Sequence, residues 1–178
     1  LNMKRSDCPY PYKDLSGCGV GFKLAQAYTH RYLIEAKGNE AIRLSGERLL
    51  PLLQLLAMSI ASDIVPITGE NRILAHFGIK QINQAPFVGI SAIINIAGIE
   101  DKKLTINELV YKIGPRINAC GRMKSGRAAV ELLLTDDATF ARQQAEEVNQ
   151  HNEERRDCDT ETTKEALAML EADATFAQ

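Results

Sequence analysis

The most informative stretch of this chain reads Gly114-Pro115-Arg116-Ile117-Asn118-Ala119-Cys120-Gly121-Arg122-Met123. No Asp or Glu occurs between Leu109 and Val130, whereas five cations do: Lys112, Arg116, Arg122, Lys124 and Arg127. Like charges so close together repel one another, and the commonest partner of such a block is a phosphate-bearing ligand. Arginine matches phosphate oxygens with a planar fork of donors, and glycine lets backbone N–H groups approach the same anion. The basic run alone favours a solvated helical face equally.

Charge is distributed unevenly along the 178 residues, although the formal net charge is only −2. Residues 1–135 hold 17 Lys and Arg against 11 Asp and Glu, a net charge of +6, whereas residues 136–178 hold 4 against 12, a net charge of −8. The chain is long enough to bury the core of one domain, and its hydrophobic content of 45% is ordinary for a globular protein. The sequence therefore predicts a basic body that carries an acidic C-terminal segment.

The cysteines do not form a metal-binding pattern. Cys8, Cys18, Cys120 and Cys158 show no C-x-x-C pair and no cluster with the three histidines. This spacing argues against a zinc site and predicts the reduced thiols of a cytoplasmic protein. No apolar run reaches membrane-spanning length and no signal-peptide pattern is present, so we expect no membrane partner. Because the chain begins at Leu1 and ends within an alanine-rich helical pattern, we expect it to be a piece of a longer protein.

The hydrophobic pattern predicts a mainly α chain with hardly any buried strand. Ser16 is expected to cap the first clear helix. A strongly apolar helix is expected over 47–60, buried on nearly all sides. Its start is placed near Leu49, because Pro51 is tolerated only in a first turn.

Further helices are expected along the rest of the chain. Ranges 87–96 and 125–134 read as short helices, and a capping box at Thr105–Glu108 opens a helix expected to end at Gly114-Pro115. The last helix begins after Asp137, and its polar character favours a connector between domains over a core element. The helix that follows Thr68 is expected to turn four apolar residues inward: Ile73, Leu74, Phe77 and Ile82.

Few single residues suggest chemistry by their spacing. Asp63 stands where a buried helix meets a proline-terminated turn, which favours an ordinary turn residue over a metal ligand by about two to one. The run 17–21 holds three glycines but lacks the third glycine of a dinucleotide fingerprint, so we interpret it as close helix packing. Asp157-Cys158-Asp159 is interpreted as a solvated helical face. The isolated histidines receive no role: His30, His76 and His151.

Four motifs in order carry a resemblance to a known family. They are Leu15-Ser16-Gly17-Cys18-Gly19-Val20-Gly21-Phe22-Lys23-Leu24, then Ala61-Ser62-Asp63-Ile64-Val65-Pro66 with Gly69-Glu70-Asn71-Arg72, then the 114–123 stretch, then Ala129-Val130-Glu131-Leu132-Leu133-Leu134-Thr135-Asp136-Asp137. Over roughly residues 5 to 170, the chain resembles the RecJ family of single-strand-specific DNA exonucleases, within the DHH phosphoesterase superfamily.

The resemblance implies a concrete activity. Such enzymes degrade single-stranded DNA from its 5′ end in DNA repair and recombination and release mononucleotides. Asp and His side chains hold Mn²⁺ or Mg²⁺, which would generate the hydroxide nucleophile and neutralise phosphate charge. Asp63 matches the family's last metal-ligand aspartate, which reverses the preference for a turn residue. Arg116, Asn118 and Arg122 match the motif that lines the substrate cleft, where they would contact DNA phosphate.

The departures from the family pattern define what is expected of this chain. The early D-x-D, a further Asp and the Asp-His-His triplet are absent from it. Residues 1–135 are therefore expected to form the C-terminal, helical portion of an α/β DHH domain. Residues 136–178 are expected to form a long interdomain connector helix leading to an absent DHHA1 domain. A single aspartate cannot hold a metal pair, so this polypeptide alone is predicted to be catalytically inactive.

Two other functions are compatible with the sequence. The first is a non-catalytic module that binds nucleic acid or protein through the basic block 112–127. The second is a phosphodiesterase acting on short oligonucleotides or cyclic dinucleotides, against which the Arg116–Arg122 motif argues. The Asp-His-His triplet upstream would distinguish the nuclease from the binding module.

Overall fold

The computed structural model describes residues 2–31, 46–63, 65–123 and 126–172, with the side chains of 122 and 123 left out. The described helices are α1 (Gly17–Thr29), α3 (Leu53–Ser62), α4 (Gly69–Gln84), α5 (Val88–Ile96), α6 (Ile106–Glu108), the π-helical turn η2 (Leu109–Ile113), α7 (Gly114–Met123), α8 (Gly126–Leu134) and α9 (Ala138–Ala172). No strand occurs within these ranges, which confirms the prediction of a mainly α chain. None of the described helices is both long and apolar enough to cross a membrane.

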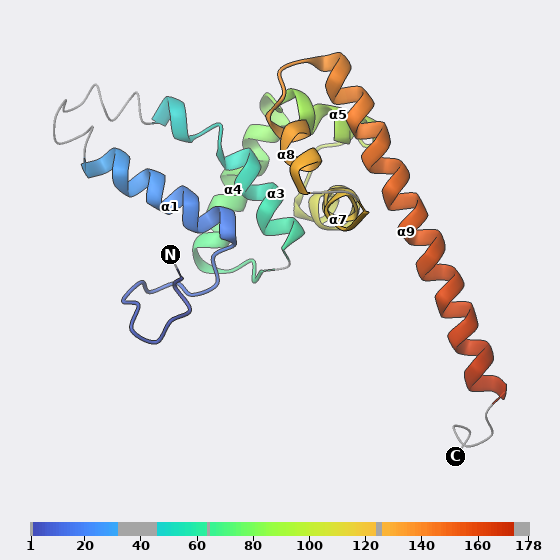
Figure 1. The fold of residues 1–178 in the computed structure, drawn as a ribbon. Coiled ribbons are helices and arrows are strands. Elements are labelled where there is room, and N and C mark those ends of the chain that lie inside the picture. Colours follow the sequence, from blue (N-terminus) through green and yellow to red (C-terminus); the bar gives the residue numbers. More distant parts are fainter. Residues whose placement is uncertain (1, 32–45, 64, 124–125, 173–178) are drawn as a thin grey trace.

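Helix α3 lies in the middle of the helical body, in contact with α1, α4 and α7 (Figure 1). Its predicted burial is confirmed, since Leu56 and Ala57 are completely buried. Its predicted start is wrong, because α3 begins at Leu53. Residues 46–49 are also helical, and a tight turn at 50–52 separates them from α3. The Leu53 N–H donates to the carbonyl of Leu50 at 3.1 Å. Pro51 has no N–H to donate and its ring crowds the preceding turn, so the helix expected over 47–60 is interrupted there and α3 starts after it.

Helix α4 packs on α3 through small residues. Its buried positions are Asn71, Ala75, Gly78 and Ile82, spaced four, three and four apart along one face. Of the apolar residues expected inward, Ile82 is buried, but Ile73 is 58% exposed and Phe77 is 46% exposed. The expectation failed for these two because the small residues Ala75 and Gly78, which carry a weak hydrophobic signal, allow the closest approach to α3.

The segment 105–123 is one continuous helical rod with a wide turn inside it. The capping box is confirmed: the Thr105 hydroxyl accepts from the Asn107 N–H at 3.2 Å, and the Glu108 carboxylate accepts from the Thr105 N–H at 2.8 Å. The predicted end at Gly114-Pro115 is wrong. The Gly114 N–H donates to the carbonyl of Leu109, five residues earlier. This wider π turn accommodates the proline ring, so the helix runs on through Pro115.

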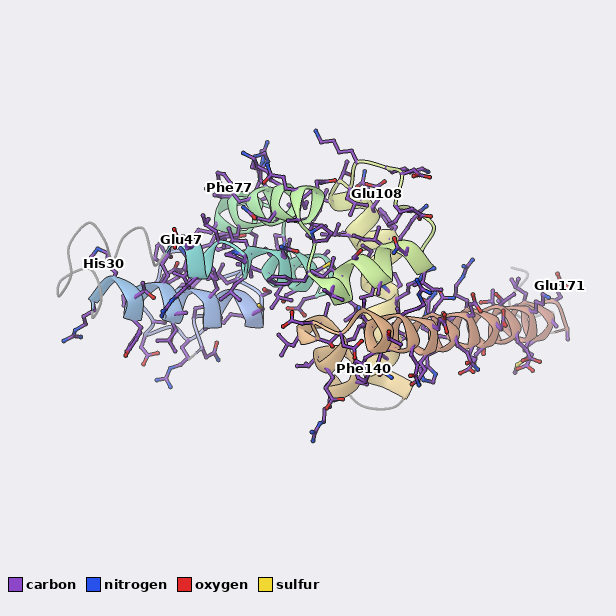
Figure 2. All side chains as sticks on the ribbon, turned by 90° about the horizontal axis from the view of Figure 1, so that it is seen from above. His30, Glu47, Phe77, Glu108, Phe140 and Glu171 are labelled. Carbon is purple, nitrogen blue, oxygen red and sulfur yellow. The ribbon has the colours of Figure 1, made fainter. Side chains whose placement is uncertain are left out.

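Helix α9 belongs half to the core and half to solvent. Its predicted cap is confirmed, because the Asp137 carboxylate accepts from the backbone N–H groups of Thr139 and Phe140 at 2.8 and 3.1 Å. Its first half contacts α5, α7 and α8 and buries Ala141 and Val148. Its far half projects away from the body, with Phe140 at the packed end and Glu171 at the free end (Figures 1 and 2). The proposed domain boundary between residues 135 and 136 stays a prediction.

Candidate functional site

A groove of about 600 Å³ opens where the first turn of α1, the end of α3, α7 and α8 meet. Its lining includes Cys18, Ser62, Asp63, Ile117 and Asn118, and apolar side chains of α3 and α8 complete it. We call it the α3–α7 groove. Two of the residues singled out in the sequence, Asp63 and Asn118, therefore share one cavity although they lie 55 positions apart.

A helix-end contact brings these two residues together. Asp63 is the C-cap of α3, is exposed, and donates its N–H to the carbonyl of Ser59 at 2.9 Å. The Asn118 side-chain amide donates to the carbonyl of Ser62 at 2.8 Å. Carbonyls in the last turn of a helix lack intrahelical partners, so this bond satisfies one of them and fixes α7 against the end of α3. Because Ser62 directly precedes Asp63, this bond holds the Asn118 amide one residue away from Asp63.

Gly114 permits the close approach of α7 to this helix end. A Cβ atom added at Gly114 would lie 3.1 Å from the carbonyl oxygen of Leu109 and 3.3 Å from the Ser62 hydroxyl. Such contacts are tighter than most that real Cβ atoms make, so a larger residue would push the start of α7 away from α3. The glycine that opens the 114–123 motif is explained by this contact.

Arg116 points to the other side of α7, against α9. Its Nε donates to the side-chain oxygen of Asn149 at 2.9 Å, and one Nη donates to the carbonyl of Lys112 at 2.5 Å. Burial lowers the pKa of Arg116, the charge of Glu153 opposes that shift, and Arg156 adds to it. Two residues along an α-helix are rotated by about 200°, so Arg116 and Asn118 face nearly opposite directions.

Arg122 and the glycine run complete the positions singled out in the sequence. The side chain of Arg122 lies outside the described residues; its backbone lies one turn after Asn118 in α7. The close-packing interpretation of 17–21 finds only a local contact at Gly19, where an added Cβ would lie 3.3 Å from Leu15, which lies just before the same helix and belongs to no other one. It is wrong for Gly17 and Gly21, which have no atom within 4 Å of that position. The predicted cap of α1 is confirmed, since the Ser16 hydroxyl accepts from the Gly19 N–H at 3.2 Å.

The described residues do not form a complete metal site. They contain no group of three or more His, Cys, Asp or Glu side chains close enough to hold an ion. Magnesium requires near-octahedral oxygen coordination, and manganese sites commonly share that geometry. Asp63 can supply one carboxylate to such a site, and the groove lining offers no second one.

Sequence reasoning missed the groove and the partners of Arg116. The amide of Asn149 lies 33 positions after Arg116, and only the packing of α9 on α7 brings the two together. A signal was present in the run of small residues along the first half of α9, including Ala141 and Ala145, which allows a close helix contact. No signal in the sequence announced that the backbone carbonyl of Ser62 would receive Asn118.

The fold matches part of a DHH-superfamily nuclease. A solved exonuclease RecJ bound to manganese aligns with a TM-score of 0.61 and 30% identity, covering 70% of this chain and 33% of that one. A structure of RecJ from Thermus thermophilus with Mg²⁺ aligns with a TM-score of 0.57 and 32% identity, covering 73% of this chain and 21% of that one. These solved RecJ structures hold Mn²⁺ or Mg²⁺.

Sequence comparison agrees with the fold. The single-stranded-DNA-specific exonuclease RecJ of Bacillus subtilis is 33% identical over 171 residues, which is 96% of this chain and 20% of that protein. The RecJ of Escherichia coli is 33% identical over 172 residues, 96% of this chain and 30% of that protein. No protein-family model matches the chain. The chain is thus homologous to the RecJ exonucleases over nearly its whole length, and it spans less than a third of these relatives.

Proposed function

We propose that this chain is part of a RecJ-type exonuclease that hydrolyses single-stranded DNA from its 5′ end with Mn²⁺ or Mg²⁺ and acts in DNA repair and recombination. The observation that carries the proposal is the sequence match to exonucleases named as single-stranded-DNA-specific, at 33–35% identity over 96% of the chain. The fold similarity to solved RecJ structures supports it. Because the chain spans 20–30% of those relatives, the activity belongs to the whole enzyme.

The α3–α7 groove is the proposed path of the DNA backbone. Asn118 at its edge and Arg122 one turn further contact phosphate oxygens, and Asp63 supplies one carboxylate to a metal site completed from outside the described residues. Arg116 keeps three of its five N–H donors after bonding Asn149 and Lys112, and we assign these to phosphate at the α7–α9 edge. The long acid-free stretch around these residues supports a polyanionic ligand.

A transplant tests the proposed enzyme. The homologous segment of Bacillus subtilis RecJ is replaced by this chain, and mononucleotide release from 5′-labelled single-stranded DNA is followed with Mn²⁺. The chimaera is expected to be active. Asp63→Asn is expected to lower its rate by more than about 100-fold, because losing a direct ligand costs more than losing an outer-shell partner, for which about 100-fold is the upper range. Asp101→Asn, on an exposed turn, is the matched control. A chimaera that folds and binds DNA but releases nothing would favour the non-catalytic binding module.

We further propose that the chain alone is catalytically inactive, because one carboxylate in the groove cannot hold a metal pair. With Mn²⁺ and single-stranded DNA it should bind and release no mononucleotides. Release that Asp63→Asn abolishes would contradict this.

The salt dependence of binding tests the arginines. Each phosphate contact on single-stranded DNA adds about 0.7 to the slope of log affinity against log salt concentration. Arg122→Ala and Arg116→Ala should each flatten the slope by about that amount. Arg155→Ala is the control, because Arg155 pairs with Asp159 on the projecting half of α9. If Arg116→Ala lowers thermal stability and leaves the slope unchanged, its role is confined to holding α7 on α9.

A further inference from the structure

Among the large apolar side chains in the described part of the chain, Tyr111 has the highest exposed fraction. It is 76% exposed, whereas the hydroxyls of Tyr10 and Tyr12 bond to Glu70 and to the carbonyl of Thr68. Among the described residues, the Tyr111 hydroxyl has no hydrogen-bond partner. An exposed aromatic ring offers a flat apolar face on which a planar ligand could stack.

The π turn is what orients Tyr111. Leu109 and Ile113 at the two ends of η2 are both completely buried, and the Gly114 N–H reaches back five residues to Leu109. One extra residue is thus accommodated between two core positions, and Tyr111 in the middle of the turn projects outward. Single π turns occur often at functional sites, where they redirect a side chain without ending the helix.

Tyr111 and Asn118 are both exposed on the same helical rod. They are seven residues apart, which corresponds to about two turns and a rise of about 10 Å. Stacked nucleotides rise by about 3.4 Å each along a strand, so this separation spans about three nucleotides. Lys112, the residue after Tyr111, is exposed. Its charge interacts with the Glu108 carboxylate four residues earlier, and no acidic residue follows before Glu131.

We propose that Tyr111 is a stacking platform for one unpaired base of the DNA strand, about three nucleotides away from the phosphate at Asn118, with Lys112 beside the strand's backbone. This inference rests on the proposed function. Stacking on an aromatic ring is tolerant of sequence, because every base has a flat face. It also discriminates against duplex DNA, in which neighbouring bases already cover those faces. Tyr111 therefore contributes to single-strand specificity without contacting the metal site.

Binding as a function of strand length tests the inference. Fluorescence anisotropy measures the affinity of the 178-residue chain for a labelled thymidine dinucleotide and a labelled thymidine octanucleotide. Removal of one base stack costs roughly 5- to 150-fold in affinity, so Tyr111→Ala should weaken octanucleotide binding by that factor. Dinucleotide binding at Asn118 should change less than about twofold, because two nucleotides do not reach Tyr111. Tyr111→Phe keeps the ring and should bind like the wild type.

Two further variants guard against effects on folding. Phe77→Ala removes an exposed ring from the outer side of α4 (Figure 2) and should leave affinity unchanged. Tyr111→Trp introduces the sole tryptophan of the chain, and its fluorescence should be quenched by the octanucleotide but not by a duplex of equal length. Quenching by both would refute discrimination by stacking.

The outcomes separate this inference from the proposed function. If the wild type binds the octanucleotide and Tyr111→Ala binds it equally well, the stacking platform is refuted and the exonuclease assignment stands. If the wild type binds neither oligonucleotide at low salt, the proposed DNA path fails and the platform fails with it. Weaker octanucleotide binding by Tyr111→Ala with intact binding by Tyr111→Phe supports the platform.

Discussion

Gly78→Ala is expected to destabilise the fold by forcing α4 away from α3. A Cβ atom at position 78 would lie 2.1 Å from the carbonyl oxygen of Leu53 and 2.7 Å from the Cβ of Ala57. Real Cβ atoms essentially never approach closer than 3.0 Å, so the backbone of one helix must move by nearly 1 Å. Because the nearest atom belongs to the backbone, no side-chain rotation relieves the clash.

The net effect follows from two opposing terms. Overpacking of a core costs about 1–3 kcal/mol, and a backbone clash belongs at the upper end. Alanine gains about 1 kcal/mol over glycine inside a helix, which leaves a loss of about 2 kcal/mol. For a domain of this size, about 1 kcal/mol corresponds to about 2–4 °C, so the melting temperature should fall by about 4–8 °C.

Gly21→Ala is the matched control for this measurement. Gly21 lies inside α1, is exposed, and has no atom within 4 Å of an added Cβ. The same chemical change there should raise the melting temperature by about 2–4 °C, since only the helix preference acts. Both variants are measured by thermal unfolding followed with circular dichroism. A Gly78→Ala protein that melts at or above the wild-type temperature would refute the steric reasoning.

Asn71→Ala should lower the free energy of unfolding by about 2–3 kcal/mol in a denaturant titration, because the buried Asn71 amide donates to the backbone carbonyls of Asp14 and Pro66 at 2.7 and 3.0 Å. A variant as stable as the wild type would contradict this. Burial and the hydrogen bond to Glu70 raise the pKa of Tyr10 to about 12. The unfolded value is about 10, so the stabilisation is complete below about pH 10 and is lost as the pH rises through about 12; stability measured against pH should lose this step in Tyr10→Phe. Asp137→Ala removes the cap of α9 and should cost about 1 kcal/mol in thermal unfolding, whereas an unchanged melting temperature would show that packing alone fixes the helix start.

Local signals in the sequence were sufficient where a helix end depends on neighbouring residues. Ser16, Thr105 and Asp137 were predicted as caps, and each accepts the expected backbone hydrogen bond. The burial of α3 was also predictable, because a helix that is apolar all round has to be covered. These features require no knowledge of how distant segments meet.

The remaining features depend on contacts between distant segments. Phe77 was expected inside because of its hydrophobicity, but Gly78 one position later sets which face of α4 approaches α3. The π turn before Pro115 lets the helix continue where a proline normally signals an end. For the candidate site, Asp63 and Asn118 were identified and lie in one groove, yet the motif alone could not show that Arg116 faces α9.

The far half of α9 is a lever arm whose fulcrum lies at the body. The roughly 20 described residues beyond Asn152 are exposed except for half-buried Arg155, and at about 1.5 Å per residue they reach about 30 Å from the last buried contact. A tilt of about 10° at the fulcrum therefore displaces the tip by about 5 Å. Close to the fulcrum, Arg116 of α7 donates a hydrogen bond to the side-chain oxygen of Asn149 in α9, and the Asn149 amide donates to Glu153. A tilt of α9 would therefore be passed through the Asn149–Arg116 hydrogen bond to α7, the helix that carries Asn118.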